Sequence, residues 1–298
     1  MNRTLHDDLP LPLLHDVVSV QSQVVYGRVG NNVARPTLEA MGLTVAAVPT
    51  VLLSNTPHYA TLHGGSLPAA WLRGFLDDLS ARGALQQLRA IVTGYLGSPA
   101  QAAVLERWIG QMLRDHPALR VVIDPVMGDE DHGIYVQPAL AQAYRERLMR
   151  LAHGLTPNGF ELAHLSGLPV HDLASVVTAA RSLLAGRTEW VAVTSAAPQS
   201  RAEGEMTVVL VTRTRVKVIT HARIDAAPKG TGDMFTAALT GHWLRGLPLT
   251  QAAARACRLV QRAIAQTRKA QCAELLLPQD ATMHSCADTP RRSRARAA

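Results

Sequence analysis

A lysine, two glycines and an aspartate lie together in Lys229-Gly230-Thr231-Gly232-Asp233, directly before an apolar stretch with helical composition. The glycines allow a tight turn and leave backbone N–H groups uncovered, and such groups at a helix N-terminus bind anions. Asp233, in the first turn, could accept a proton from an attacking hydroxyl while the N–H groups hold a transferring phosphoryl group. The alternative is an ordinary helix start in which Asp233 serves as the cap.

Two other polar clusters follow short apolar runs. Asp124 opens the segment Asp124-Pro125-Val126-Met127-Gly128, and a carboxylate in that position suits a contact with Mg²⁺ or its water, although a simple Asp-Pro turn explains it too. Thr156-Pro157-Asn158 is followed by Glu161, at a spacing that fits either a metal site or a helix capping box.

Two further segments could bind a small ligand. Ser22 to Gly27, with Gly30 and Asn31, follows the first apolar run, and its alternative role is a glycine-rich loop before a helix cap. His58 stands in a polar loop, where it could stack on a ring or simply decorate the surface.

The elements that must position these residues alternate between two hydrophobic periods. Strands are predicted at 16–22, 43–54, 88–93, 120–124, 154–156 and 189–194, with an antiparallel pair at 206–212 and 215–220. Helices are predicted at 31–42, 66–83, 98–114, 138–151, 159–166, 172–185, 231–245 and 249–270. This order predicts an α/β fold with a mainly parallel sheet covered on both faces. Its ligand site should lie beyond the carboxyl ends of the strands, where Ser22, Asp124, Thr156 and Thr194 are found.

Composition limits the class of protein. Of 298 residues, 47% are hydrophobic and 18% charged, which is enough to form a core. The longest apolar stretch, 43–53, is too short to span a bilayer. The net charge is +7, and four arginines and one aspartate in residues 287–298 supply +3 of it. The three cysteines fit neither a disulfide framework nor a zinc site, which favours a cytoplasmic location. A P-loop, an H-E-x-x-H and a G-x-S-x-G motif are all absent from the sequence.

Six segments, in order and spacing, resemble the pyridoxine/pyridoxal/pyridoxamine kinases. They are Ser19 to Gly27, Val48 to His58, Thr93 to Gly97, Asp124 to Gly128, Thr156 to Asn158 with Glu161, and Lys229 to Asp233. The first two are similar to the vitamin B6 kinases in particular, and the last to the wider ribokinase-like superfamily. The resemblance covers about 16–278. It implies a ribokinase-like three-layer α/β/α sandwich in one domain, 16–280, with an extension at 1–15 and a basic, disordered tail at 281–298.

The resemblance implies ATP-dependent phosphorylation of the 5′-hydroxymethyl group of pyridoxal, pyridoxine and pyridoxamine in pyridoxal 5′-phosphate salvage, with Mg²⁺ and K⁺. Asp233 would be the general base beside the acceptor, and Gly230, Thr231 and Gly232 would form the anion hole. Ser22 and His58 would contact the pyridine. The nucleotide site would be lined by Asp124, Thr156, Glu161, Thr194, His221, Ala222, Arg223, Ile224 and Thr231. Tyr135 and Glu161 would lie by the metal.

Several alternatives stay open at this stage. A hydroxymethylpyrimidine kinase of thiamine metabolism shares the fold and chemistry, a sugar kinase shares the fold, and a silent B6- or nucleotide-binding protein is a third possibility. Lys229 could form a Schiff base with an aldehyde product or could simply face solvent near phosphate. We expect a homodimer and no membrane partner, and a nucleic-acid contact only through the tail.

Overall fold

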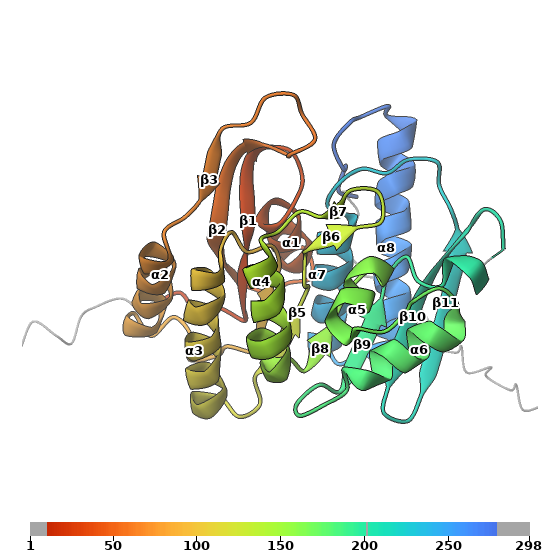
Figure 1. Ribbon diagram of the computed structural model, residues 1–298. Helices are drawn as coiled ribbons and strands as arrows, with labels where there is room; N and C mark the ends of the chain where they lie inside the picture. The colour runs from red at the N-terminus through yellow and green to blue at the C-terminus, as the bar shows by residue number, and fades with distance from the viewer. Residues whose placement is uncertain (1–10, 201, 279–298) are drawn as a thin grey trace, which may run out of the picture.

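The computed structural model describes residues 11–200 and 202–278 (Figure 1). The strands are β1 (Val17–Tyr26), β2 (Val45–Asn55), β3 (Gly64–Ser66), β4 (Ala90–Thr93), β5 (Arg120–Ile123), β6 (Gly128–Asp129), β7 (Gly133–Ile134), β8 (Gly154–Leu155), β9 (Trp190–Val193), β10 (Glu205–Thr212) and β11 (Val216–Ala222). The helices are α1 (Asn31–Glu39), α2 (Ala69–Ala81), α3 (Pro99–Asp115), α4 (Pro138–Ala143), α5 (Gly159–Ser166), α6 (Leu173–Ser182), α7 (Thr231–Leu244) and α8 (Leu249–Lys269).

One sheet of nine strands runs through the molecule in the order β11-β10-β9-β8-β5-β4-β1-β2-β3. The six strands from β9 to β2 are parallel, while β10 pairs antiparallel with β9 and β11, and β3 pairs antiparallel with β2. Because β1 lies between β2 and β4, the order reverses there, and open α/β sheets bind ligands beside such a switch point. The mainly parallel sheet predicted from the sequence is confirmed.

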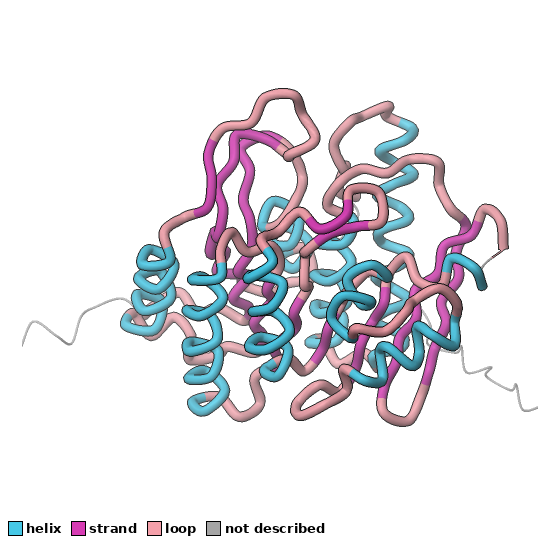
Figure 2. The backbone as a smooth tube through the Cα atoms, viewed as in Figure 1, coloured by secondary structure: helices cyan, strands magenta, loops and turns pink. Residues whose placement is uncertain are grey.

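Helices cover both faces of the sheet, and this makes three layers. Helices α2 to α6 lie in front of it and α1, α7 and α8 behind it, with the strands between them in Figure 2. The strands divide their side chains between the two layers: Val121 and Ile123 of β5 join the core of the front layer, whereas Val122 joins the core of the rear layer. Helix α7 is buried along most of its length because α1 and α8 both pack against it.

Three features depart from the predicted elements. The predicted loops after β2 and β5 contain the short strand β3 and the hairpin β6–β7. The helix predicted at 138–151 is α4 followed by a π-helical turn (Tyr144–Leu148) and a 3-10 turn (Met149–Leu151). In the π-helical turn Tyr144 is fully buried, and its hydroxyl donates a hydrogen bond to the carbonyl of Gly94, 2.7 Å away, at the end of β4.

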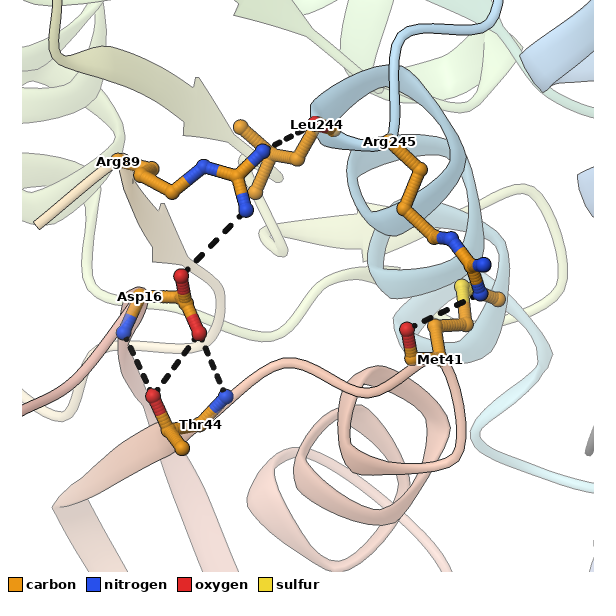
Figure 3. Close-up of polar contacts among 6 residues, drawn as sticks. All are labelled: Asp16, Met41, Thr44, Arg89, Leu244 and Arg245. Carbon is orange, nitrogen blue, oxygen red and sulfur yellow. Dashed lines mark hydrogen bonds and ion pairs between the residues drawn. The ribbon is translucent and has the colours of Figure 1, made fainter.

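The end of the sheet away from the strands' carboxyl termini is closed by a polar cluster. Figure 3 shows its six residues, Asp16, Met41, Thr44, Arg89, Leu244 and Arg245. Asp16 Oδ2 accepts hydrogen bonds from the amide and the hydroxyl of Thr44, both at 2.9 Å. The Arg89 guanidinium donates to the carbonyl of Leu244 and lies 3.4 Å from Asp16 Oδ1. These contacts tie the C-terminal end of α7 to the beginning of β1.

The predicted extension at 1–15 is described only from residue 11, and the predicted tail at 281–298 lies outside the described residues. In the part of the chain that the structure describes, none of the helices combines the length and the apolar character needed to cross a membrane.

Candidate active site

Helix α7 begins at the glycine-rich segment, at the carboxyl edge of the sheet. Gly230 caps it with φ 93°, in the left-handed region that favours glycine. A Cβ atom on Gly230 would lie 1.9 Å from the carbonyl oxygen of Arg28, so this position also lacks room for a side chain. Asp233 is in the first turn of α7 and Gly232 is exposed, so uncovered backbone N–H groups lie next to a carboxylate.

The turn between β1 and α1 packs against this helix start. The amide of Gly30 donates a hydrogen bond of 2.9 Å to Asp233 Oδ2. Gly30 has φ 54°, and a Cβ atom there would lie 2.5 Å from the hydroxyl of Ser22. Ser22 itself is buried in β1, opposite an irregularity in the register with β2. The structure therefore brings Ser22 and Asp233 to either side of Gly30.

A row of hydroxyls joins α7 to the carboxyl ends of β5 and β8. The hydroxyl of Thr236 donates to Asp124 Oδ2 at 3.0 Å, and the hydroxyls of Thr236 and Thr156 are 2.8 Å apart. A Cβ atom on Gly232 would lie 4.0 Å from Asp124 Oδ2, so Asp124 is also close to the first turn of α7. Asp124 and Thr156, predicted from their positions after two strands, therefore meet at the start of α7.

Glu161 is buried in the first turn of α5, where it takes part in a capping box. Asn158 Oδ1 accepts from the Glu161 amide at 2.8 Å, and Glu161 Oε2 accepts from the Asn158 amide at 2.9 Å. Its other oxygen, Oε1, accepts from the amide of Met127 at 2.9 Å. The capping alternative is therefore real, and it also fixes a carboxylate next to the loop that carries Asp124.

Burial acts on all three carboxyl groups, and Asp124 is also affected by the charges of the other two. Burial, followed by the charges of Glu161 and Asp233, raises the pKa of Asp124 well above its usual range. Burial raises the pKa of Glu161 to about 7, against the opposing hydrogen bonds from backbone amides. Burial also raises the pKa of Asp233, and the Gly30 hydrogen bond opposes this. A cation placed among these groups would relieve their repulsion.

The hairpin β6–β7 lies beside the acidic groups. Tyr135 follows β7, and its ring centroid is 6.4 Å from that of Tyr95. Desolvation, followed by the charges of Glu161 and Asp124, raises the pKa of the Tyr135 hydroxyl. Asp129, on β6, lies 3.9 Å from the Lys229 ammonium and so links the hairpin to the residue before Gly230.

The carboxylates near the start of α7 could bind a divalent cation together with substrate phosphates, but they do not form a metal cage of their own. Among the described residues no group of three or more His, Cys, Asp and Glu side chains converges as a metal cage would. Mg²⁺ is usually held by one or two carboxylates together with substrate phosphates and water. Asp124 and Glu161, beside uncovered N–H groups that suit phosphate, fit that mode of binding.

His58 lies in the loop between β2 and β3. Its ring stacks against Tyr59 at 4.1 Å between centroids, and its Nε2 is 3.8 Å from Glu274 Oε1. Together with Lys229 and Cys272, it lines a cleft of about 410 Å³.

The remaining predicted residues extend along the same edge of the sheet. Thr194 forms an isolated bridge with Asn158, directly after β9. The segment from His221 to Ile224 ends β11, four strands from Asp124, or about 19 Å at the usual strand spacing. This spread matches a long ligand lying across the strand ends rather than a compact one.

Sequence reasoning missed Thr236 and Glu274. Thr236 stands three residues after Asp233, a helical spacing that places both on one face, and this signal was available. Glu274 follows α8 with no local pattern, so only the folded chain reveals its contacts.

The sequence model of the phosphomethylpyrimidine kinase family matches residues 37–275. The chain is 57% identical over 268 residues to a pyridoxine/pyridoxal/pyridoxamine kinase of Bordetella pertussis, covering 90% of this chain and 94% of the other. It is 33% identical over 238 residues to a pyridoxal kinase of Rubrobacter xylanophilus, covering 80% and 82%.

The solved structures that resemble this chain carry the same family names as these relatives. Pyridoxal kinase from Leishmania donovani in complex with ADP and pyridoxamine superposes with a TM-score of 0.79 at 28% identity, covering 85% of this chain and 87% of the other. A phosphomethylpyrimidine kinase from Bacteroides thetaiotaomicron, in a form with pyridoxal, gives a TM-score of 0.77 at 27% identity, covering 85% and 88%. The likeness confirms the three-layer ribokinase-like fold expected from the sequence.

Proposed function

The chain belongs to the pyridoxine/pyridoxal/pyridoxamine kinase family, and from this we propose that it transfers the γ-phosphoryl group of ATP to the 5′-hydroxymethyl group of B6 vitamers. The observation that carries the proposal is the contact between Gly30 and Asp233, because it holds a carboxylate between the uncovered N–H groups of α7 and the Ser22 segment. A base, an anion hole and a place for an acceptor thus meet at one point.

Phosphoryl transfer depends mainly on positioning and on stabilising charge. Asp233 accepts the proton of the acceptor hydroxyl as the new bond to phosphorus forms, which makes it the general base. Burial raises its pKa from the ordinary value toward neutral pH, as suits a general base. The backbone of Gly230, Thr231 and Gly232 stabilises the negative charge on the transferring group through its N–H groups and the dipole of α7.

The nucleotide lies across the carboxyl ends of β5, β8, β9 and β11 in this proposal. Asp124, Thr156, Glu161 and Thr231 surround its phosphates, and Thr194 and the segment from His221 to Ile224 accommodate the rest. Glu161 and Asp124, with Tyr135 beside them, would hold Mg²⁺, which would supply positive charge to the phosphates. The spread of these residues along one sheet edge supports the assignment.

The acceptor ring lies on the other side of Asp233, between Ser22 and His58. Ser22 supplies a buried polar edge close to Gly30, and His58 supplies a flat ring on the cleft that Lys229 also lines. A planar aromatic ring with polar substituents suits both contacts.

The proposal also includes the finer expectations from the sequence: a K⁺ requirement, a homodimer and a cytoplasmic location. The two cysteines in the described residues, Cys257 in the core and Cys272 at the surface, are both free. Free cysteines are typical of proteins in the reducing cytoplasm. Comparing initial rates in KCl, NaCl and choline chloride tests the K⁺ requirement, and sedimentation equilibrium tests the dimer.

The function is tested by measuring ADP release from Mg-ATP with each of five acceptors: pyridoxal, pyridoxine, pyridoxamine, hydroxymethylpyrimidine and ribose. We expect turnover with the three B6 vitamers. Turnover with hydroxymethylpyrimidine alone would keep the mechanism and move the enzyme to thiamine metabolism. Absence of turnover with all five, in a folded sample that binds ATP, would contradict the proposal and favour a binding protein.

A further inference from the structure

A buried carboxylate far from the sequence motifs contacts two loops near the proposed acceptor site, the turn at residues 27–30 and the loop at residues 56–59. Glu274 lies in the segment after α8 and is 7% exposed. Its Oε2 accepts hydrogen bonds from the amide of Arg28 at 3.0 Å and from the hydroxyl of Thr56 at 3.2 Å. Its Oε1 accepts a hydrogen bond from the hydroxyl of Tyr59 at 2.7 Å. Figure 1 shows the blue segment after α8 bending toward the orange loop that follows β2.

The first of these loops, the turn at residues 27–30, touches the catalytic helix start on its other side. Gly30 donates to Asp233, and the carbonyl of Arg28 fills the space that a side chain on Gly230 would occupy. The turn is thus held between two carboxylates, with Glu274 bonded to Arg28 and Asp233 bonded to Gly30. A shift of this turn would move the general base relative to the anion hole.

The second loop carries His58. Thr56 and Tyr59, on either side of it in sequence, both donate to Glu274, and the His58 ring stacks on Tyr59. Glu274 therefore fixes both ends of the short segment that presents His58 to the cleft. One carboxylate sets the position of the acceptor-side histidine and of the turn that holds Asp233.

The segment carrying Glu274 is itself firmly anchored. Leu275 is fully buried in the rear core. The hydroxyl of Thr267, in the last turns of α8, accepts a hydrogen bond from the amide of Leu276 at 2.8 Å. Because its neighbours are fixed in this way, Glu274 can orient the two loops rather than follow them.

We propose that Glu274 is a positioning residue that aligns Asp233 and the acceptor vitamer for phosphoryl transfer. The proposal rests on the proposed function. It places Glu274 behind the reacting groups, which it does not touch. Misplacing reacting groups by about 1 Å can cost about 100-fold in rate, so the effect on turnover should be large. The nucleotide lies on the far side of Asp233, so its binding should change little.

Two substitutions separate the charge of Glu274 from its hydrogen bonds. Glu274→Ala removes every contact. Glu274→Gln keeps an oxygen for Arg28 and Thr56, and its NH₂ group can donate to the Tyr59 hydroxyl. Glu39→Ala is the matched control, since Glu39 is a carboxylate on α1 that forms an exposed ion pair with Arg35.

The test measures kcat and the KM of pyridoxal and of ATP for each variant, together with hydrogen–deuterium exchange of peptides covering residues 27–32. For Glu274→Ala we expect kcat to fall about 10- to 100-fold, with a higher KM for pyridoxal, an ATP KM within about twofold of wild type, and faster amide exchange in the turn. Glu274→Gln should restore kcat to within about fivefold of wild type and restore slow exchange. Glu39→Ala should match wild type.

Three results would overturn the positioning role: an unchanged kcat in Glu274→Ala, equal increases in both KM values, or a glutamine variant no better than the alanine variant. If Glu274→Ala does not fold, Tyr59→Phe replaces it and should raise the KM of pyridoxal while leaving exchange in residues 27–32 slow. An unchanged KM for pyridoxal, or equal increases in the KM values of pyridoxal and ATP, would then count against the proposal. The exchange measurement needs no turnover. If wild type phosphorylates none of the acceptors but amide exchange in the turn is fast in Glu274→Ala, the proposed function is rejected. The conclusion that Glu274 holds the turn at residues 27–30 in place would still stand.

Discussion

Asp233 Oδ2 accepts a hydrogen bond of 2.9 Å from the amide of Gly30, which precedes it by 203 residues. This contact joins the start of α7, which carries the proposed anion hole, to the turn that follows β1. The proposed general base is consequently held by the loop on the acceptor side rather than by its own helix alone. In the proposed mechanism, the same turn therefore supports both the base and the acceptor site, and several consequences can be measured.

Replacing Asp233 with alanine should lower kcat by about 10²- to 10⁴-fold with little change in the KM of ATP, because a general base is lost while the phosphate contacts remain. Asp233→Asn should lose similar activity, although its side-chain oxygen can still accept from Gly30, so its thermal stability should stay near that of wild type. A loss of less than about fivefold in either variant would remove Asp233 from this role.

The pH dependence of kcat/KM offers an independent check on Asp233. A base acts in its ionised form, so activity should disappear as pH falls through the pKa of Asp233. Burial raises that pKa above its ordinary value of 3.8, and the activity loss should therefore begin at a higher pH than an exposed aspartate would give. An acid limb at or below the ordinary value, measured with a sample that remains folded, would contradict this.

Gly230 can be compared with a glycine of nearly the same backbone conformation. Gly230 has φ 93° and Gly246 has φ 87°, but a side chain on Gly230 would strike the carbonyl of Arg28, whereas one on Gly246 would enter open space. Both alanine variants should lose about 1–2 kcal/mol of stability from the left-handed conformation. Only Gly230→Ala should also lose kcat, since the turn at 27–30 must move. Equal activity in the two variants would show that this close approach is unimportant.

The sequence predicted the layers well because they depend on local periodicity. Short apolar runs such as 120–124, alternating with helical stretches, suffice to predict a parallel sheet, and the carboxyl-end rule then places Asp124 and Thr156 on one edge. Their contact through Thr236 was not predicted, although Thr236 shares a helix face with Asp233.

Other parts of the site depend on contacts that no local pattern encodes. The hairpin β6–β7 is made of two-residue strands in a polar segment, too short to show an alternation. In the π-helical turn, the Tyr144 hydroxyl donates a hydrogen bond to the carbonyl of Gly94, 50 residues away in the sequence. Glu274 accepts a hydrogen bond from the amide of Arg28, 246 residues away in the sequence, and no local pattern near either residue predicts that contact.

Glu161→Gln should raise the Mg²⁺ concentration needed for half-maximal activity by about 10- to 100-fold, the usual cost of weakening a metal site. The amide can still accept one of the two backbone hydrogen bonds that Glu161 accepts, so α5 should remain folded. Glu189→Gln is the control, because Glu189 is 54% exposed in a surface ion pair with Arg120. An unchanged Mg²⁺ dependence in Glu161→Gln would assign Glu161 to capping alone.

Lys229 is one of three lysines in the chain, with Lys217 and Lys269. If its amine forms a Schiff base with the aldehyde product, borohydride treatment with pyridoxal 5′-phosphate should make inhibition irreversible and add one adduct at Lys229. Lys229→Arg keeps the charge beside Asp129 but should escape modification. Equal labelling of all three lysines, or no adduct by mass spectrometry, would leave Lys229 as a solvent-facing lysine near phosphate.

The cluster at the opposite end of the sheet should make stability depend on pH through Asp16. Burial acts to raise the pKa of this carboxyl, but hydrogen bonds from Thr44 and the nearby Arg89 outweigh it, so the pKa in the folded protein lies below the ordinary value of 3.8. Folding then favours the ionised form. The resulting stabilisation is fully present above the unfolded pKa and is lost as pH falls through the folded one.

Asp16→Asn should therefore cost about 1–2 kcal/mol in the free energy of unfolding at pH 7, and this cost should shrink toward zero as pH falls below about 4. Taking the difference between variant and wild type at each pH cancels the opposite contribution of the buried carboxyls at the active site. Asp78→Asn is the control, since Asp78 is 72% exposed beside Arg82, and it should stay within about 0.5 kcal/mol of wild type throughout. Urea unfolding between pH 3 and 7 measures both variants. A cost for Asp16→Asn that does not change with pH would mean that its charge contributes nothing and that packing or neutral hydrogen bonds hold this end of the sheet together.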